Sequence, residues 1–283
     1  MRDDTDSTSP VDDLVRDRLE HSRGAVDVLA EAVAVLRSFG TDDTHLTVDE
    51  LVGRTGLTLG VVQELVQALV TTGLLEPTGI SYRLSTLLFE LGMPASAERG
   101  LIEVATPFLE DLYERTRETV HLGVREQLDV VYISKIGGHG FTEVPSRIGE
   151  RLPLHCTAIG EVMLANADDA TFAAVVKRGL TPAGPKTITV PAVLRAQLQS
   201  IVDSGHSFEY EESTAGIGCI AAPIRAADGR VIAAVSIAGP MYRFSPEQHR
   251  ESVRAAMDAI STLFARRVEV PNASALSRGQ DCC

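Results

Sequence analysis

Apolar residues recur at intervals of three and four along the first part of the chain, between residues 23 and 39. They place one apolar face on a helix: Val26, Leu29, Val33 and Leu36. Gly40 follows this helix as a terminator. The preceding residues 1–22 are rich in charge and offer little apolar surface, so we expect a mobile N-terminal arm.

A second group of patterns, from Thr47 to Leu84, predicts two helices followed by two short strands. Thr47 and Glu50 have the spacing of a capping box at the start of the first, short helix. Gly56 can adopt the left-handed backbone of the tight turn that ends this helix.

The second helix of this group begins after Thr58, whose side chain we expect to cap it, and stops at Gly73. Its inward face is apolar: Val62, Leu65, Val66 and Leu69. Two short strands follow, Leu74–Glu76 and Ile80–Leu84, joined through Pro77-Thr78-Gly79. This succession predicts a winged helix-turn-helix, a module whose second helix usually enters the DNA major groove.

From residue 85 to residue 117 the pattern is again helical, and its later part carries an apolar stripe: Leu101, Val104, Phe108 and Leu112. Beyond it we expect strands at 119–125, 128–136, 151–155, 206–212, 219–225 and 231–239. We expect helices at 157–167, 169–178 and 192–204. A last helix should start at a capping box formed by Ser245 and Gln248 and end at about residue 267. Strands in runs, without strict βαβ alternation, indicate an α+β domain on an antiparallel sheet.

The predicted organisation therefore has four parts. They are a mobile arm at 1–22, a winged helix-turn-helix domain at 23–94, a linker helix with a second domain at 95–268, and a disordered tail at 269–283. A length of 283 residues suits two domains rather than one core.

Composition narrows the class of protein. No apolar run reaches the length of about 18 residues that a membrane span needs, and the acidic N-terminus is unlike a secretory signal, so we expect a cytoplasmic protein without membrane contact. The four cysteines show no zinc-ligand spacing, and we expect neither metal nor cofactor. A net charge of -13 argues against non-specific coating of nucleic acid but leaves room for a small DNA-reading module.

Two stretches of the second domain resemble the IclR family of bacterial transcriptional regulators. They are RIGERLPLHCTAIGEVMLA at 147–165 and GIGCIAAPIRAADGRVIAAVSIAGP at 216–240. The resemblance implies a DNA-binding domain joined by a helix to a GAF-like domain that binds a small-molecule effector. It also implies assembly as a homodimer or a dimer of dimers that binds double-stranded operator DNA.

Matching the motifs position by position implies an effector site made of seven residues: Leu152, Ala158, Ile159, Glu209, Ile217, Cys219 and Ser236. A loop around Phe141 and Val144 is a further, looser match. The resemblance implies that this pocket opens on one face of the sheet.

The physical chemistry of this predicted pocket suits a small organic or aromatic acid. Residues 157–160 open a helix, whose free N–H groups can bind a carboxylate, and Ser236 adds a hydroxyl. Glu209 would repel an anion unless it accepts a ligand hydroxyl or is protonated by burial. Glu161 stands where the family usually has lysine and would compete with an anion, so a neutral or hydroxylated ligand is a rival.

The predicted DNA-reading helix departs from the family pattern. Two positions that are usually basic hold Leu59 and Glu64, and residues 23–84 contain four arginines against eight acidic residues. Because phosphate neutralisation supplies much of the affinity for DNA, we expect few phosphate contacts. Gln63 can read adenine, and the other candidate contacts are Arg54, Thr55, Thr58, Gly60 and Arg83.

Two functions remain open. The leading hypothesis is a regulator whose effector changes dimer geometry and operator binding. The rival is a ligand-sensing or scaffold protein of the same architecture that has lost sequence-specific DNA binding, with the Leu59-Val61-Val62 surface as a protein contact. An enzyme that uses Cys219 as a nucleophile beside His155 or His206 is disfavoured, because nothing in the sequence positions a base.

Overall fold

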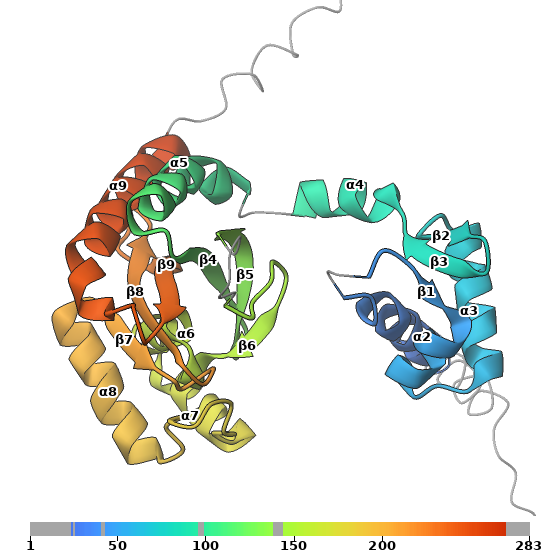
Figure 1. Ribbon diagram of the computed structural model, residues 1–283, viewed down its shortest axis with the longest axis horizontal. Helices are drawn as coiled ribbons and strands as arrows, with labels where there is room; N and C mark the ends of the chain where they lie inside the picture. Colours follow the sequence, from blue (N-terminus) through green and yellow to red (C-terminus); the bar gives the residue numbers. More distant parts are fainter. Residues whose placement is uncertain (1–23, 25, 41–42, 96–98, 138–143, 270–283) are drawn as a thin grey trace, which may run out of the picture. The chain divides into compact units, whose positions relative to one another are not determined.

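The computed structural model describes residues 24, 26–40, 43–95, 99–137 and 144–269. The chain divides into two compact units, with the division between Ser96 and Ala97. Figure 1 shows the helices and strands of each unit. The predicted arm at 1–22 and nearly all of the predicted tail, residues 270–283, lie outside the described residues.

The N-terminal unit is a winged helix-turn-helix, as the sequence predicts. A helix over residues 26–37 precedes β1 (Leu46–Thr47), α2 (Val48–Thr55), α3 (Leu59–Thr71), β2 (Leu75–Thr78), β3 (Ser81–Leu84) and α4 (Thr86–Ala95). The three strands form an antiparallel sheet in the order β1-β3-β2. The core of the unit is apolar: Val35, Leu46, Leu51, Val62, Leu65, Val66, Leu69 and Leu75.

The predicted cap of α2 is confirmed, whereas the predicted cap of α3 is wrong. The side chain of Thr47 accepts a hydrogen bond from the Glu50 backbone N–H, and the Glu50 side chain accepts one from the Thr47 backbone N–H. Gly56 ends α2 with a φ of 70°, in the left-handed region. Thr58 occupies the N-cap position of α3, but its side chain makes no capping hydrogen bond.

The turn of the wing lies further along the chain than predicted. β2 extends through Pro77 to Thr78, and the turn consists of Gly79 and Ile80. Pro77 fits in β2 because this strand is at the edge of the sheet. Proline has no backbone N–H, and on the outer side of an edge strand no neighbouring strand needs that hydrogen bond. Gly79 has a φ of 64°, which a two-residue hairpin turn requires.

Of the apolar face predicted for the first helix, only Leu36 packs against the core of this unit. Val26, Leu29 and Val33 are 62%, 65% and 39% exposed, whereas Val35, outside the predicted face, is fully buried. The helical period is right, but the face that packs against α2 and α3 is a different one. The predicted face remains available to another surface.

The C-terminal unit is built around one curled antiparallel sheet, which confirms the predicted α+β class. Its strands are β4 (Thr119–Glu126), β5 (Asp129–Ile136), β6 (Arg151–Pro153), β7 (Ser207–Tyr210), β8 (Ile217–Arg225) and β9 (Val231–Pro240). They are ordered β6-β5-β4-β9-β8-β7. The helices are α5 (Arg99–Thr116), α6 (Ala158–Ala165), α7 (Asp169–Arg178), α8 (Pro191–Ser204) and α9 (Arg250–Glu269), with short 3-10 turns η1 (Leu154–Cys156) and η2 (Pro246–His249).

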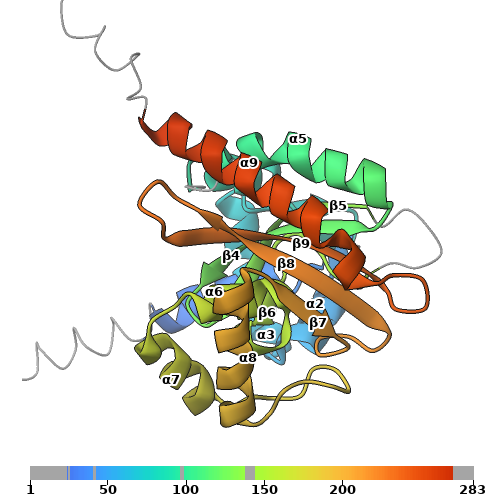
Figure 2. The same ribbon diagram turned by 90° about the vertical axis from the view of Figure 1, so that its left-hand side faces the viewer.

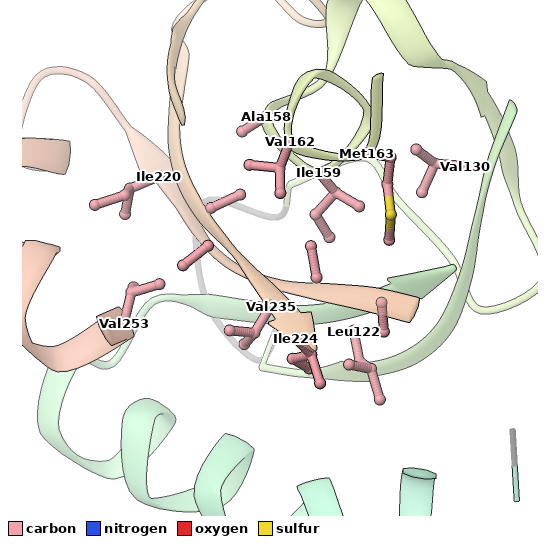
Figure 3. Close-up of a cluster of buried hydrophobic side chains, with 14 of the residues drawn as sticks. Leu122, Val130, Ala158, Ile159, Val162, Met163, Ile220, Ile224, Val235 and Val253 are labelled. Atoms are coloured by element: carbon pink, nitrogen blue, oxygen red, sulfur yellow. The ribbon is translucent and has the colours of Figure 1, made fainter. Parts of the chain in front are cut away.

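Helices cover both faces of this sheet. α5 and α9 lie together along one face, and α6, with α8 beside it, lies on the other (Figure 2). The side chains of Ile159 and Met163 on α6 lie toward Val130 on β5, whereas Leu122 on β4 lies on the opposite side of the sheet (Figure 3). This burial of branched side chains fixes the start of α6 against the sheet.

Two helix predictions in this unit need correction. The inward face of α5 consists of Leu101, Ala105, Leu109 and Leu112, and the predicted Val104 and Phe108 are only half-buried. At Ser245 the chain forms a 3-10 turn before α9 begins at Arg250. The hydroxyl of Ser245 donates to the Glu247 carboxylate and caps no backbone N–H, so the predicted capping box is absent.

Candidate functional site

A cavity opens between the sheet and the start of α6. In the structure it is narrow, with a cavity volume of about 20 Å³. Its walls come from β4, β5, η1–α6, β7–β9 and the segment before β6: His121, Tyr132, Val144, Pro145, Ser146, Leu152, Thr157, Ala158, Ile159, Glu209, Ser213, Thr214, Ile217, Cys219, Ser236 and Ala238. The structure thus brings all seven residues of the predicted effector site to one cavity. Val144 also lines it, and Phe141 lies outside the described residues.

The first turn of α6 presents backbone N–H groups to this cavity. Thr157 caps the helix, and its hydroxyl oxygen accepts a hydrogen bond of 3.0 Å from the Gly160 N–H. The N–H groups of Ala158 and Ile159, ahead of it, have no carbonyl partner within the helix. Both residues line the cavity, so the helix start is suited to an anionic oxygen of a ligand.

Gly160 is required by the tight approach of η1 to this helix start. A Cβ atom at this position would lie 2.4 Å from the carbonyl oxygen of Leu154 and 2.6 Å from the Thr157 hydroxyl oxygen. The glycine therefore lets η1 fold back onto α6 while Thr157 keeps its capping bond. This packing positions the two free N–H groups.

His121 on β4 is a cavity residue that the sequence reasoning missed. Its ring stacks on Tyr132 with 4.7 Å between the ring centroids, and its Nε2 atom is 2.7 Å from the Ser146 hydroxyl oxygen. Burial, with a smaller contribution from nearby Lys135, lowers the pKa of His121 to about 3, so the ring is neutral at physiological pH. A neutral imidazole can form a hydrogen bond with a ligand but adds no positive charge to the cavity. Sequence spacing gives no signal for it, because only the pairing of β4 with β9 brings His121 beside Ser236.

Glu209 on β7 is fully buried at the cavity wall. Its Oε1 atom accepts hydrogen bonds from the backbone N–H groups of Glu212 and Ser213, the latter at 3.1 Å. Its Oε2 atom has no hydrogen-bond partner among the described residues. Burial raises the pKa of Glu209 against the lowering effect of its hydrogen bonds, which favours the neutral carboxylic acid.

Glu161 does not line the cavity, so its predicted competition with an anionic ligand is wrong. Its side chain is fully buried behind α6, where Oε1 accepts from Gln197 Nε2 at 2.7 Å and Oε2 from the Ser207 hydroxyl at 2.5 Å. The sequence placed Glu161 correctly in the first turn of the helix, but a side chain in that turn can face either way. Its direction depends on the packing of α8 and β7.

Cys219 shows no arrangement for nucleophilic catalysis. It lies opposite Glu209 in the β7–β8 register, and burial raises its pKa, so the thiol is protonated. His155 Nε2 contacts the carbonyl oxygen of Thr181 at 3.1 Å, and His206 Nδ1 contacts that of Ser204 at 3.0 Å. His155 therefore ties down the segment after α7 rather than the start of α6. Within the described ranges, no three His, Cys, Asp or Glu side chains gather as metal ligands.

The outward face of α3 is the candidate DNA-reading surface. Gly60 and Gln63 are exposed on it, as predicted, and Gln67 and Thr71 continue the same face one and two turns later. A shallow hollow on this face is lined by Gln63, Glu64, Gln67, Ala68, Thr71 and Thr72. Gln67 is a second amide that the sequence reasoning missed, although its spacing of four from Gln63 was readable.

The two arginines predicted to contact DNA backbone are both engaged within the chain. Arg54 donates to both carboxylate oxygens of Asp43 and, at 2.9 Å, to the carbonyl oxygen of Ser38. Arg83 on β3 forms an ion pair with Glu76 on β2. The hydroxyl of Thr55 donates to the Leu51 carbonyl oxygen at 2.7 Å. The polar contacts available to DNA are therefore fewer than the sequence alone indicates.

Comparison with known proteins agrees with both units. Residues 28–79 match the model of the IclR helix-turn-helix domain, and residues 94–262 match that of the bacterial transcriptional regulator IclR C-terminal domain. The HTH-type transcriptional regulator KdgR of Escherichia coli K12 is 32% identical over 238 residues, which cover 83% of this chain and 90% of KdgR. The Pca regulon regulatory protein of Pseudomonas putida is 28% identical over 74% of this chain and 72% of its own length.

Solved structures give the same relationship. An IclR homologue from Microbacterium hydrocarbonoxydans, complexed with 4-hydroxybenzoate, is 31% identical with a TM-score of 0.76 and covers 85% of this chain and 99% of its own. IclR of Thermotoga maritima is 26% identical with a TM-score of 0.69, and the match covers 85% of this chain and 99% of the Thermotoga chain. Among the described residues, no helix has the length and apolarity to cross a membrane. With its winged helix-turn-helix and its cavity-bearing antiparallel sheet, this chain belongs to the IclR family of transcriptional regulators, with a DNA-binding domain followed by an effector-binding domain.

Proposed function

We propose that the effector of this regulator is a small aromatic or other organic carboxylate that occupies the cavity at the start of α6. The observation that carries the proposal is the wall of the cavity, where the free N–H groups of Ala158 and Ile159 share one space with apolar Leu152 and Ile217. The N–H groups would donate hydrogen bonds to the carboxylate, and the apolar side chains would contact the ring or chain of the ligand. The similar Microbacterium chain, complexed with 4-hydroxybenzoate, supports this ligand class.

The effector acts on DNA binding through differential affinity for two arrangements of paired winged helices. A ligand shifts such an equilibrium only as far as it prefers one arrangement. This step needs a homodimer. The exposed apolar residues of the first helix, Val26, Val28 and Leu29, support self-association, because such a surface is costly to leave in water.

A second candidate function is ligand sensing without sequence-specific DNA binding. It is favoured by the internal pairing of Arg54 with Asp43 and of Arg83 with Glu76. It is favoured also by α3 itself, which has no lysine or arginine. In this case α3 would contact a protein. In either case the chain acts by binding, and a catalytic role has no support in the surroundings of Cys219.

Binding to the DNA upstream of its own gene distinguishes the two functions. Fluorescence polarisation at about 50 mM salt, with and without 4-hydroxybenzoate and benzoate, is the measurement. Specific binding that changes with the carboxylate supports the regulator. Carboxylate binding by thermal shift, with no DNA binding at that salt concentration, would favour the sensor. A protein that binds neither carboxylate nor DNA would reject the proposal.

A further inference from the structure

Three buried carboxyl groups connect the cavity to the interior behind α6. Glu209 on β7, Glu212 in the turn after it and Glu161 on α6 are 0%, 6% and 0% exposed. The backbone N–H of Glu212 donates to the Glu209 carboxyl group. The Gln197 amide donates to Glu161 Oε1 at 2.7 Å and to Glu212 Oε1 at 3.4 Å. Only Glu209 lines the cavity, and the other two lie behind it.

No cation balances this cluster. None of the ion pairs found within the described part of the chain includes Glu161, Glu209 or Glu212, and the nearby Lys186 pairs with Glu211 instead. Arg178, from the end of α7, pairs with Asp129. Because burial penalises every uncompensated charge and like charges repel, three neighbouring carboxyl groups without a counterion cannot all ionise.

The hydrogen bonds place a proton at the cavity side of the cluster. Glu209 Oε1 accepts two backbone N–H groups, which suits an unprotonated oxygen, and the carboxyl group also has the Cys219 thiol and the Ser213 hydroxyl beside it. Oε2 of Glu209 and Oε2 of Glu212 are both buried with no geometric hydrogen-bond partner in the described structure, and of these two residues only Glu209 lines the cavity. A bare, charged Oε2 would be strongly disfavoured there. A protonated Oε2 is a hydrogen-bond donor that lacks only an acceptor, and a ligand in the cavity can supply one.

The surroundings reinforce this state. Burial raises the pKa of all three carboxyl groups, that of Glu212 to about 7, and the repulsion between Glu161 and Glu212 acts in the same direction on Glu161. The other titratable groups that interact with the cluster are two thiols and a phenol. Burial raises the pKa of Cys156 to about 12, and it raises the pKa values of Cys219 and Tyr132 well above their ordinary values. At neutral pH these groups bring no charge to the cluster.

We propose that the cavity binds its small carboxylate effector together with one proton, held on Glu209 and kept there by Glu161 through Gln197 and Glu212. The proton comes from solvent and sits on Glu209 Oε2, from which it is donated to the effector carboxylate in a hydrogen bond. Glu161 touches no part of the cavity and is a positioning residue: it sets the charge state of the residue that meets the ligand. The inference rests on the proposed function, because it assumes a carboxylate effector.

The proposal has a direct consequence for affinity. When the cluster holds its proton, binding is insensitive to pH. Above the pH at which the proton is lost, a carboxylate must bind with its proton, so the Kd rises tenfold per pH unit. Glu161→Gln removes one of the three acids, which makes ionisation of Glu209 easier and moves the loss of affinity to lower pH.

Infrared spectroscopy of the unliganded full-length protein tests the charge state without a ligand. The carboxylic-acid stretch is followed between about pH 6 and pH 9 in the wild type, Glu209→Gln, Glu161→Gln and the matched control Glu211→Gln, whose carboxylate pairs with Lys186 outside the cluster. We expect an acid band at neutral pH that Glu209→Gln removes. We expect Glu161→Gln to move its midpoint to lower pH and Glu211→Gln to leave it in place. Absence of the band, or a midpoint that Glu161→Gln does not move, would overturn the proposal.

Calorimetry with benzoate and 4-hydroxybenzoate then tests the link to binding. Titrations one pH unit above the midpoint of the acid band, in two buffers with different heats of ionisation, give the number of protons taken up, and the expected value approaches one for the wild type. Carboxylate binding without proton uptake overturns this inference alone. Failure of both carboxylates to bind, with the acid band of Glu209 intact, overturns the proposed effector class and this inference with it.

Discussion

The guanidinium group of Arg54 at the end of α2 forms a two-pronged hydrogen bond with the carboxylate of Asp43, which lies in the segment before β1. The Asp43 carboxylate occupies the side of the guanidinium group that could otherwise bind a phosphate in the same two-pronged way. The side chain remains 42% exposed, so the pair is at the surface and can be exchanged. We therefore propose that Asp43 competes with a DNA phosphate for Arg54.

Replacing Asp43 with asparagine is expected to strengthen binding to DNA. The change releases the Arg54 guanidinium, and one added phosphate contact steepens the fall of log K with log salt by about 0.9. Fluorescence polarisation across a salt series measures both the affinity and this slope. Arg54→Ala in the Asp43→Asn background is the control and should cancel the gain. An unchanged slope in Asp43→Asn would exclude Arg54 as a phosphate contact.

Replacing Gln63 or Gln67 on α3 with alanine is expected to reduce the preference for the operator over a scrambled sequence. A bidentate glutamine–adenine contact contributes about 1–3 kcal/mol of discrimination, which is a loss of about 5- to 150-fold in the ratio of the two affinities. Competition binding with both DNA sequences gives the ratio. Gln199→Ala, which removes an exposed glutamine on α8 in the C-terminal unit, is the matched control. Retained preference in the double variant Gln63→Ala/Gln67→Ala would favour a protein-contacting role for α3.

Replacing Gly160 with alanine is expected to lower stability and effector binding together. The added Cβ would press against the Leu154 carbonyl oxygen, and relief of such a clash costs about 1–3 kcal/mol. Gly53→Ala is a matched control, because Gly53 is also helical and a Cβ there meets no atom within 4 Å. That substitution should raise stability by up to about 1 kcal/mol. Equal effects of the two substitutions in chemical denaturation would argue against the close packing of η1 on α6.

The neutral His121 is expected to make the protein sensitive to acid. The pKa of His121 is about 3 in the folded chain and 6.5 ordinarily, so the unfolded chain binds the proton first as the pH falls. Stability is then lost below about pH 6.5, and the loss reaches about 3 kcal/mol at pH 4. Chemical denaturation at pH 7.5 and pH 4 should show a larger difference for the wild type than for His121→Gln. The same difference in both proteins would mean that His121 is protonated in the folded state.

Local elements follow from local chemistry, and the sequence predicts them well. The capping box at Thr47 and Glu50, the left-handed turn at Gly56 and the buried stripe of α3 all appear as expected, because each depends on residues within one or two turns of each other. The sequence motifs around residues 147–165 and 216–240 also led to seven residues that the structure gathers at one cavity. Errors at Thr58 and Ser245 concern which of two nearby groups a hydroxyl bonds, a choice decided by small differences in free energy.

What the sequence determined by itself is the succession of elements, their class and the family's two-domain plan. Only the tertiary structure decided which way individual side chains face. Glu161 turns away from the cavity to Gln197 and Ser207, His121 joins the cavity through the pairing of β4 with β9, and Arg54 is held by Asp43. The physical reason is the same in each case: these contacts join segments that are distant along the chain, and the charge of a buried group depends on neighbours that only the folded chain supplies.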